Sequence, residues 1–154
     1  MNDLYLENKM KIEIKKLDKN AVIPEYATSG SAAVDLRANI TKPVVLDLGE
    51  TFLAPTGLAI NIAEGEVAAL ILPRSGLGHN YGIKLGNSVG LIDSDYQKEL
   101  MVSIKNTGTG IYKINPQDRI AQMLFVPVII ADFVEVDEFS SKTNRGGFGS
   151  TGVA

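Results

Sequence analysis

Apolar and polar residues alternate with a period of two along much of the chain. In the first such segment, residues 10–14, charged side chains separate Met10, Ile12 and Ile14. The same alternation recurs in three further segments, at residues 34–40, 58–62 and 100–104. This pattern is typical of strands with one buried face. The more continuous apolar runs at residues 66–72 and 119–130 predict strands that are more fully buried.

Turn residues interrupt these segments at short intervals, since 15 Gly and 6 Pro are spread over 154 residues. We find no window of ten or more residues in which apolar positions follow a period of 3.6, so little helix is expected. Many short strands joined by frequent turns favour an all-β sandwich or barrel. The length predicts a single domain.

Composition narrows the function classes. The chain contains no Cys and one His, His79, which excludes disulfides, a thiolate nucleophile and a Cys-based or His-rich metal cluster. A net charge of −3 argues against a generic nucleic-acid partner. The longest apolar run has nine residues, whereas a membrane helix needs about 20. We therefore expect a soluble, cytoplasmic protein that binds neither membrane nor nucleic acid. Residues 1–9 resemble no targeting peptide and are interpreted as an N-terminal extension.

Two segments in the middle of the chain carry candidate chemistry. PRSGLG, from Pro73, follows a predicted strand and contains an Arg suited to phosphate oxygens, although this segment taken by itself favours a turn with an exposed Arg. Residues 86–104 have the pattern of a β-hairpin, in which Asp93 and Asp95 share a face. Paired carboxylates can polarise water or bind a cation, but Asp in a hairpin tip is more often turn chemistry. Asp35 is a third candidate that a solvated strand face also explains.

The last segment, residues 140–154, is rich in Gly, Ser and Thr and contains one large apolar residue, Phe148. Composition alone favours a frayed terminus. A formal GxGxxG at residues 147–152 is not a dinucleotide fingerprint, because no helix follows it. A Gly-rich segment with one aromatic ring can also close over a ligand.

Five motifs in this order resemble the homotrimeric dUTP diphosphatases (dUTPases), over residues 10–152. They are SAAVDLRA from Ser31, PRSGLG from Pro73, GNSVGLIDSDYQ from Gly86, DRIAQM from Asp118 and RGGFGSTG from Arg145. The resemblance implies a distorted jelly-roll-like barrel or sandwich at residues 10–139 and a flexible lid at residues 140–154. It also implies a homotrimer whose active sites draw motifs from more than one subunit.

The same resemblance implies hydrolysis of dUTP to dUMP and pyrophosphate with Mg²⁺, by attack of water at the α-phosphorus. That activity limits uracil incorporation into DNA and supplies dUMP for thymidylate synthesis. Asp93 matches the family's general base, and Asp35 matches its metal-site carboxylate, acting through coordinated water.

The residues implied to bind substrate fall into four groups. Those on the phosphates are Arg74, Ser75, Gly76, Gln122 and Arg145. Those around uracil are Asn87, Gly90, Leu91, Ile92 and Met101. Tyr96 packs beneath the deoxyribose and blocks a 2′-hydroxyl. Phe148 stacks over uracil in the lid, next to Gly149.

Several positions depart from the usual family pattern. Ala33, Lys98 and Gln117 stand where Gly is common in the family. Thr143 occupies the usual place of the phosphate-binding Arg of the tail. Arg145 therefore reaches the γ-phosphate from a shifted register, or that contact is missing.

Two other functions compete with this interpretation. A dCTP deaminase of the same fold is expected to carry a catalytic Glu beyond the hairpin, whereas this chain has Tyr96, PRSGLG and the Gly-rich tail. A non-catalytic nucleotide sensor is disfavoured by the presence of Asp35 and Asp93 together with a complete tail.

Overall fold

The computed structural model describes residues 10–63 and 65–141. In chain order its elements are β1 (Glu13–Lys16), β2 (Val34–Arg37), β3 (Val44–Leu46), β4 (Thr51–Asn61), β5 (Val67–Leu72), α1 (Ser75–Tyr81), β6 (Ile83–Leu85), β7 (Gly90–Ile92), β8 (Glu99–Asn106), β9 (Tyr112–Ile114) and β10 (Arg119–Pro127). The prediction of an all-β fold with little helix is confirmed.

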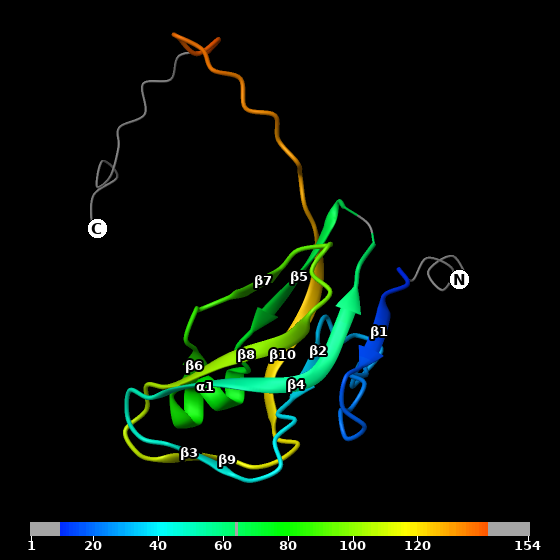
Figure 1. The fold of residues 1–154 in the computed structure, drawn as a ribbon. Coiled ribbons are helices and arrows are strands. Elements are labelled where there is room, and N and C mark those ends of the chain that lie inside the picture. Colours follow the sequence, from blue (N-terminus) through cyan, green and yellow to red (C-terminus); the bar gives the residue numbers. More distant parts are fainter. Residues whose placement is uncertain (1–9, 64, 142–154) are drawn as a thin grey trace.

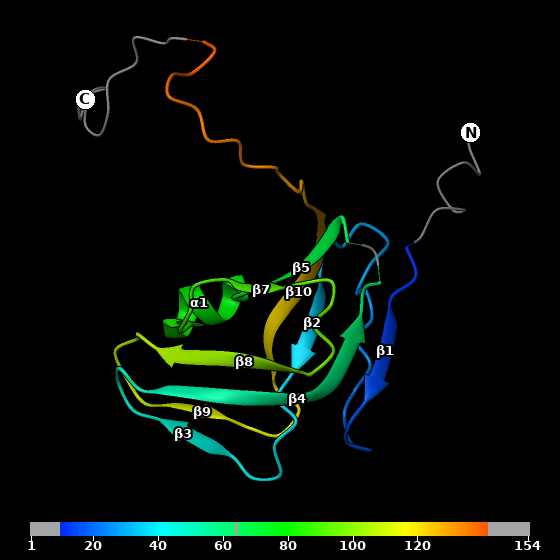
Figure 2. The same ribbon diagram turned by 45° about the horizontal axis from the view of Figure 1, so that its top comes forward.

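The strands form two four-stranded antiparallel sheets and one small sheet (Figures 1 and 2). We call the sheet in the order β1-β4-β8-β6 sheet A and the sheet in the order β2-β10-β5-β7 sheet B. Strands β3 and β9 pair separately. Among residues 10–63 and 65–141 each sheet has two open edges, so this part of the chain forms a sandwich rather than a closed barrel.

Alternation along the strands builds the core. In β8, buried and half-buried residues alternate without interruption, and Leu100, Val102 and Ile104 are fully buried. In β2, Val34 and Leu36 are buried while Asp35 and Arg37, which alternate with them, are half-buried. Burial of each such apolar side chain contributes about 1.5–3 kcal/mol, so the sequence pattern directly fixes which face of each sheet points inward.

The predicted hairpin at residues 86–104 is wrong. Strand β7 pairs with β5 in sheet B, whereas β8 pairs with β4 and β6 in sheet A. The two apolar arms are neighbours in sequence but each finds its buried partner in a different sheet. Residues 93–98 therefore cross from one sheet to the other as a turn, in which the Tyr96 N–H donates to the Asp93 carbonyl at 3.1 Å. Asp93 and Asp95 lie in this turn and do not share a strand face.

The prediction of a turn at PRSGLG is also wrong, because Ser75–Tyr81 forms the helix α1. Two glycines within the motif lower its helix propensity, which hides the helix in the sequence. Leu77 packs against the core and holds the helix in place. Gly82 ends it in the left-handed conformation, and its N–H donates to the carbonyls of Gly78 and Leu77.

Gln117 adopts a positive φ of 67°, which is a conformation that glycine tolerates best. This accounts for the Gly that the family commonly has here. Two hydrogen bonds hold the Gln117 backbone in that conformation. The Gln117 N–H donates to the Ala38 carbonyl at 2.8 Å, and the Gln117 carbonyl accepts from Arg37 Nη1 at 2.8 Å.

The strand predicted to reach residue 130 ends at Pro127. Residues 128–139, which we call the C-terminal arm, leave the sandwich as an extended segment (orange in Figures 1 and 2). Several large apolar side chains of the arm face solvent, with exposed fractions of 95% for Ile129 and 98% for Phe133. Within the described part of the chain, no helix is long and apolar enough to cross a membrane.

Candidate active site

The register of sheet B places two predicted site residues, Asp35 and Gln122, in one row next to the strand end that leads into PRSGLG. Gln122 on β10 lies opposite Asp35 on β2 and opposite Leu72 on β5. Residues directly opposite each other in a sheet point to the same face. Val34 and Met123 point into the core, so Asp35 and Gln122 point outward. The Gln122 side-chain amide also donates to the carbonyl of Pro73, just after β5, at 2.9 Å.

Asp35 is held by two guanidinium groups. Its Oδ1 accepts from Arg74 Nε at 2.8 Å and its Oδ2 from Arg119 Nη1 at 3.3 Å. Arg74 Nη1 additionally donates to the Arg119 carbonyl at 3.3 Å. One carboxylate between two permanent cations leaves a net positive charge at this row, which suits an anionic ligand.

Arg119 is a residue of this cluster that was not predicted from the sequence. It lies three residues before Gln122, so a regular strand would point the two side chains to opposite faces. The β2–β10 register shifts between Arg119 and Ala121. A bulge of this kind re-aims a side chain, and here Arg119 reaches Asp35 on the outer face. Its place within DRIAQM was the one signal available in the sequence.

The beginning of α1 lies next to the Asp35 row and adds backbone N–H groups to it. Arg74 is the N-cap residue, and none of the described side chains caps the helix. The first N–H groups of the helix, which include those of Ser75 and Gly76, therefore lack intrahelical partners. A Cβ at Gly76 would meet nothing within 4 Å, so a ligand has room to approach this backbone.

A hollow of about 360 Å³ lies beside the row and is lined in part by Ser31, Ala33, Asp35, Leu72 and Gln122. It combines a carboxylate, an amide and a hydroxyl with small apolar side chains. Such a mixture fits a polar ligand that lies along the outer face of sheet B.

Tyr112 on β9 has a displaced pKa. Burial raises the pKa of its phenol above the ordinary value, and the negative charge of Asp118 and the neighbouring Tyr81 act in the same direction. The positive charge of Arg74 acts against them. The phenol therefore stays protonated at neutral pH and adds no negative charge near Arg74.

The predicted uracil and sugar residues form a second group around β7. A Cβ at Gly90 would approach Ile71 at 3.1 Å, so close packing of β7 on β5 favours glycine there. Asn87 and Leu91 are exposed, and Ile92 is half-buried. Met101 is half-buried on β8, opposite Pro55.

Tyr96 and Asp93 belong to the same group. The Tyr96 ring packs against the core, and its hydroxyl donates to the Glu99 carbonyl at 2.9 Å. Asp93 lies exposed at the start of the turn. The turn thus presents a carboxylate to solvent beside a fixed aromatic ring.

A single chain keeps these two groups apart. Strands β2 and β7 are opposite edges of sheet B, three strand spacings or about 14 Å from each other. Ile92 also pairs with Ala69, three residues or about 10 Å along β5 from Leu72. The turn that carries Asp93 begins still further from the Asp35 row.

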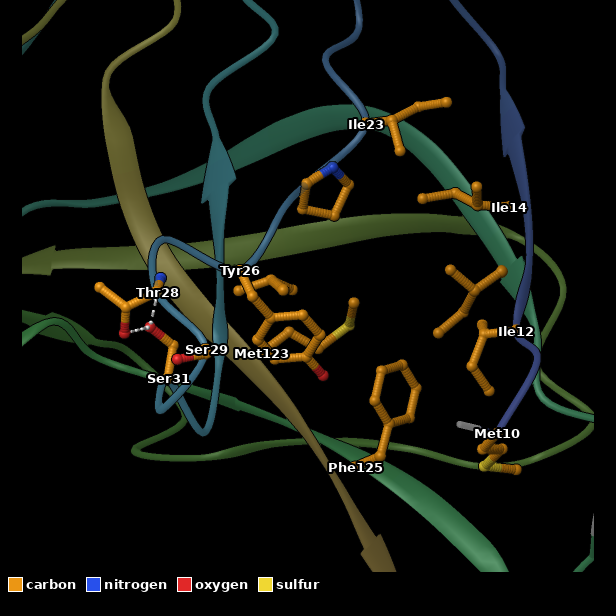
Figure 3. A pocket seen from close by; sticks show the side chains of 13 residues that line it. Met10, Ile12, Ile14, Ile23, Tyr26, Thr28, Ser29, Ser31, Met123 and Phe125 are labelled. Atoms are coloured by element: carbon orange, nitrogen blue, oxygen red, sulfur yellow. Dashed lines mark hydrogen bonds between the residues drawn. The ribbon is translucent and has the colours of Figure 1, made fainter. Parts of the chain in front are cut away.

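A different hollow, of about 600 Å³, opens between the two sheets (Figure 3). Its apolar side chains come from β1, β2, β4, β10 and the residues before and after β1, and they include Met10, Ile12, Ile14, Met123 and Phe125. We call it the apolar groove. It lies on the core side of sheet B, whereas Asp35 and Gln122 face outward, so it is not part of the polar site.

Three predicted site residues, Arg145, Phe148 and Gly149, lie outside the described residues. The N-terminal extension and most of the predicted lid do so as well.

Comparison with known proteins identifies the class. The family model described as dUTPase matches residues 19–152, and the chain belongs to this family. The deoxyuridine 5'-triphosphate nucleotidohydrolase of Paraburkholderia phymatum is 56% identical over 146 residues, which cover 93% of this chain and 99% of the relative. That of Neisseria gonorrhoeae is 57% identical over 93% of this chain and 97% of the relative.

Solved structures agree with this assignment. The dUTPase of Staphylococcus bacteriophage 80alpha with dUpNHpp is 29% identical, with a TM-score of 0.83 over 94% of this chain and 100% of that chain. A mutant dUTPase from phage phi11 of S. aureus, described with a structural Mg(II) ion, is 25% identical, with a TM-score of 0.76 over 85% and 99%.

Proposed function

We propose that the chain hydrolyses dUTP to dUMP and pyrophosphate by attack of water at the α-phosphorus. The row of Asp35, Arg74 and Gln122 on the outer face of sheet B carries this proposal, in a chain of the dUTPase family. The enzyme acts in the cytoplasm, where it limits uracil incorporation into DNA and supplies dUMP for thymidylate synthesis.

Arg74, Gln122 and the first amides of α1 bind the triphosphate. A guanidinium and preorganised N–H groups can absorb the charge that develops on the phosphate oxygens and on the leaving pyrophosphate. Arg74 already points into the site through its ion pair with Asp35. Arg119 supports this arrangement by holding the second oxygen of Asp35.

Asp35 is the carboxylate available for Mg²⁺. Within the described residues no three acidic or His side chains converge, so the chain does not form a metal cage by itself. This donor set fits a metal that is held by one carboxylate together with substrate phosphates and water. When bound, Mg²⁺ neutralises phosphate charge. Because both oxygens of Asp35 accept from guanidinium groups, a contact through water suits this carboxylate.

Asp93 is the general base that aligns and deprotonates the attacking water, since it is a carboxylate presented to solvent at the start of the turn. Tyr96 supports the deoxyribose and excludes a 2′-hydroxyl. The backbone around Asn87, Gly90, Leu91, Ile92 and Met101 pairs with the uracil edge. Cytosine would leave buried groups of such a pocket unpaired, which is a strong basis for rejection.

The position of the acidic residue of β8 favours dUTP hydrolysis over dCTP deamination, which is expected to need a catalytic Glu beyond the turn. Beyond the turn, the sequence of β8 contains one acidic residue, Glu99. Its carboxylate accepts from the Gly57 N–H at 2.7 Å and is tied to β4. The Glu99 carboxylate therefore makes a structural contact and is poorly placed to act as the catalytic Glu on a cytosine ring.

The functional enzyme is a homotrimer with shared active sites. The separation between Asp93 and the Asp35 row supports this assembly, because a second copy can bring its own turn to the row of the first. In this assembly we propose that the C-terminal arm of one copy packs in the apolar groove of another. Ile129, Phe133 and Val136 of the arm are exposed, while β1 and β2 leave open sheet edges on either side of the groove.

Mixing two inactive variants tests the activity and the shared site together. We expect Asp93→Asn and Arg74→Ala each to release little pyrophosphate from dUTP. When differently tagged chains are co-expressed and the mixed trimers are purified, one site in each mixed trimer, or one third of the sites, combines an intact Arg74 with an intact Asp93 from another chain. We therefore expect about one third of the wild-type rate. Mixed oligomers no more active than either variant alone would contradict the shared site.

A further inference from the structure

A distortion in β4 lies directly beside the turn that carries Tyr96. Along the β4–β8 ladder, Pro55 pairs with Met101 and Ala59 with Glu99, so β4 has two more residues than β8 over this stretch. Gly57 sits inside the distortion with φ 68°. A Cβ there would approach Asn39 Nδ2 at 2.5 Å, so the backbone depends on glycine at this position.

The side chain of Glu99 bonds to the backbone of this bulge. Its Oε1 accepts from the Gly57 N–H at 2.7 Å in a part-buried position. Next to it, the buried Thr56 hydroxyl donates to the Leu100 carbonyl at 2.7 Å. The beginning of β8 is thus attached to the bulge by a charge-assisted bond and a buried bond.

The backbone carbonyl of Glu99 also holds the Tyr96 side chain. The Glu99 carbonyl accepts from the Tyr96 hydroxyl at 2.9 Å, and the ring packs against the core. Glu99 therefore bonds to the bulge through its carboxylate and to Tyr96 through its carbonyl. A displacement of Glu99 from the bulge would move the hydroxyl anchor of the ring.

We propose that Glu99 is a positioning residue that, by docking on the β4 bulge, fixes the Tyr96 ring and so contributes to the preference for deoxyribose over ribose. The inference rests on the proposed function, because it assigns Tyr96 to the sugar. Without the carboxylate, the ring gains freedom to shift and a 2′-hydroxyl is rejected less strongly.

The test compares three variants. Glu99→Ala removes the acceptor for the Gly57 N–H, Glu99→Gln retains an acceptor oxygen on a side chain of the same length, and Lys98→Ala changes the exposed neighbour as a matched control. The measurement is kcat/KM for dUTP and for UTP, with thermal unfolding recorded in parallel. We expect Glu99→Ala to reduce the dUTP-to-UTP preference roughly tenfold, Glu99→Gln to restore most of it and Lys98→Ala to leave it unchanged.

A Glu99→Ala variant that folds and keeps the wild-type preference would overturn the inference, as would a Glu99→Gln variant that loses as much preference as Glu99→Ala. If Glu99→Ala does not fold, Tyr96→Phe takes its place, because it removes the hydroxyl that bonds to Glu99. Full preference in Tyr96→Phe would also overturn the inference. Wild-type protein that does not hydrolyse dUTP would instead overturn the proposed function.

Discussion

Asp93→Asn is expected to bind dUTP as the wild type does and to lose at least ~10²-fold in turnover. The substitution preserves the shape of the side chain but removes the group that accepts a proton from water. Asp93 contributes its carbonyl, not its carboxylate, to the turn contact with the Tyr96 N–H, so the turn should survive. Nucleotide binding measured by calorimetry and pyrophosphate release measured in the same buffer separate the two effects.

Asp95→Asn is the matched control, since Asp95 is exposed in the same turn two residues later. We expect its turnover to stay near the wild-type value. A collapse of turnover in Asp95→Asn, with near-normal turnover in Asp93→Asn, would reverse the assignment of the base.

Removal of residues 142–154 is expected to leave the fold and the oligomer intact and to lower turnover by at least roughly 10²-fold, as tail donors to the phosphates and the cover over the site are lost together. The last strand ends at Pro127, and the C-terminal arm ends before the deletion. We expect burial of Phe148 against uracil to contribute about 1.5–3 kcal/mol. Unfolding temperature, oligomer mass and dUTP turnover are the measurements.

Arg145→Ala distinguishes the parts of the tail. We expect its turnover to fall between those of the full-length and truncated chains if Arg145 contacts phosphate from its shifted position. A truncated protein that hydrolyses dUTP at the full-length rate would show that the tail is not a lid.

The sequence predicted the strands well where one face is buried and the other is not. In β8, alternation of Leu100, Val102 and Ile104 with more polar residues reports the two faces directly. The same pattern does not reveal which strand lies alongside. The apolar arms of β7 and β8 suggested a hairpin because they are close in sequence, whereas burial draws them into different sheets.

The site was predictable where motifs match a family and not where local geometry decides. Asp35 and Arg74 were expected from their motifs, and the structure joins them at 2.8 Å. Arg119 depends on a bulge that reverses its face, and period-two reasoning assumes regular strands. The bulge at Gly57 that holds Glu99 escaped notice for the same reason.

Incubation of the wild-type protein with Mg²⁺ and, separately, dUTP, dCTP, dTTP or UTP tests the central claim most directly, with pyrophosphate and ammonia both measured. The polar row, the turn and the membership of the dUTPase family predict rapid pyrophosphate release from dUTP, little from the other three nucleotides and no ammonia from any. Ammonia from dCTP would contradict the assignment and indicate a deaminase. No product from any nucleotide would indicate a nucleotide-binding protein without catalytic activity.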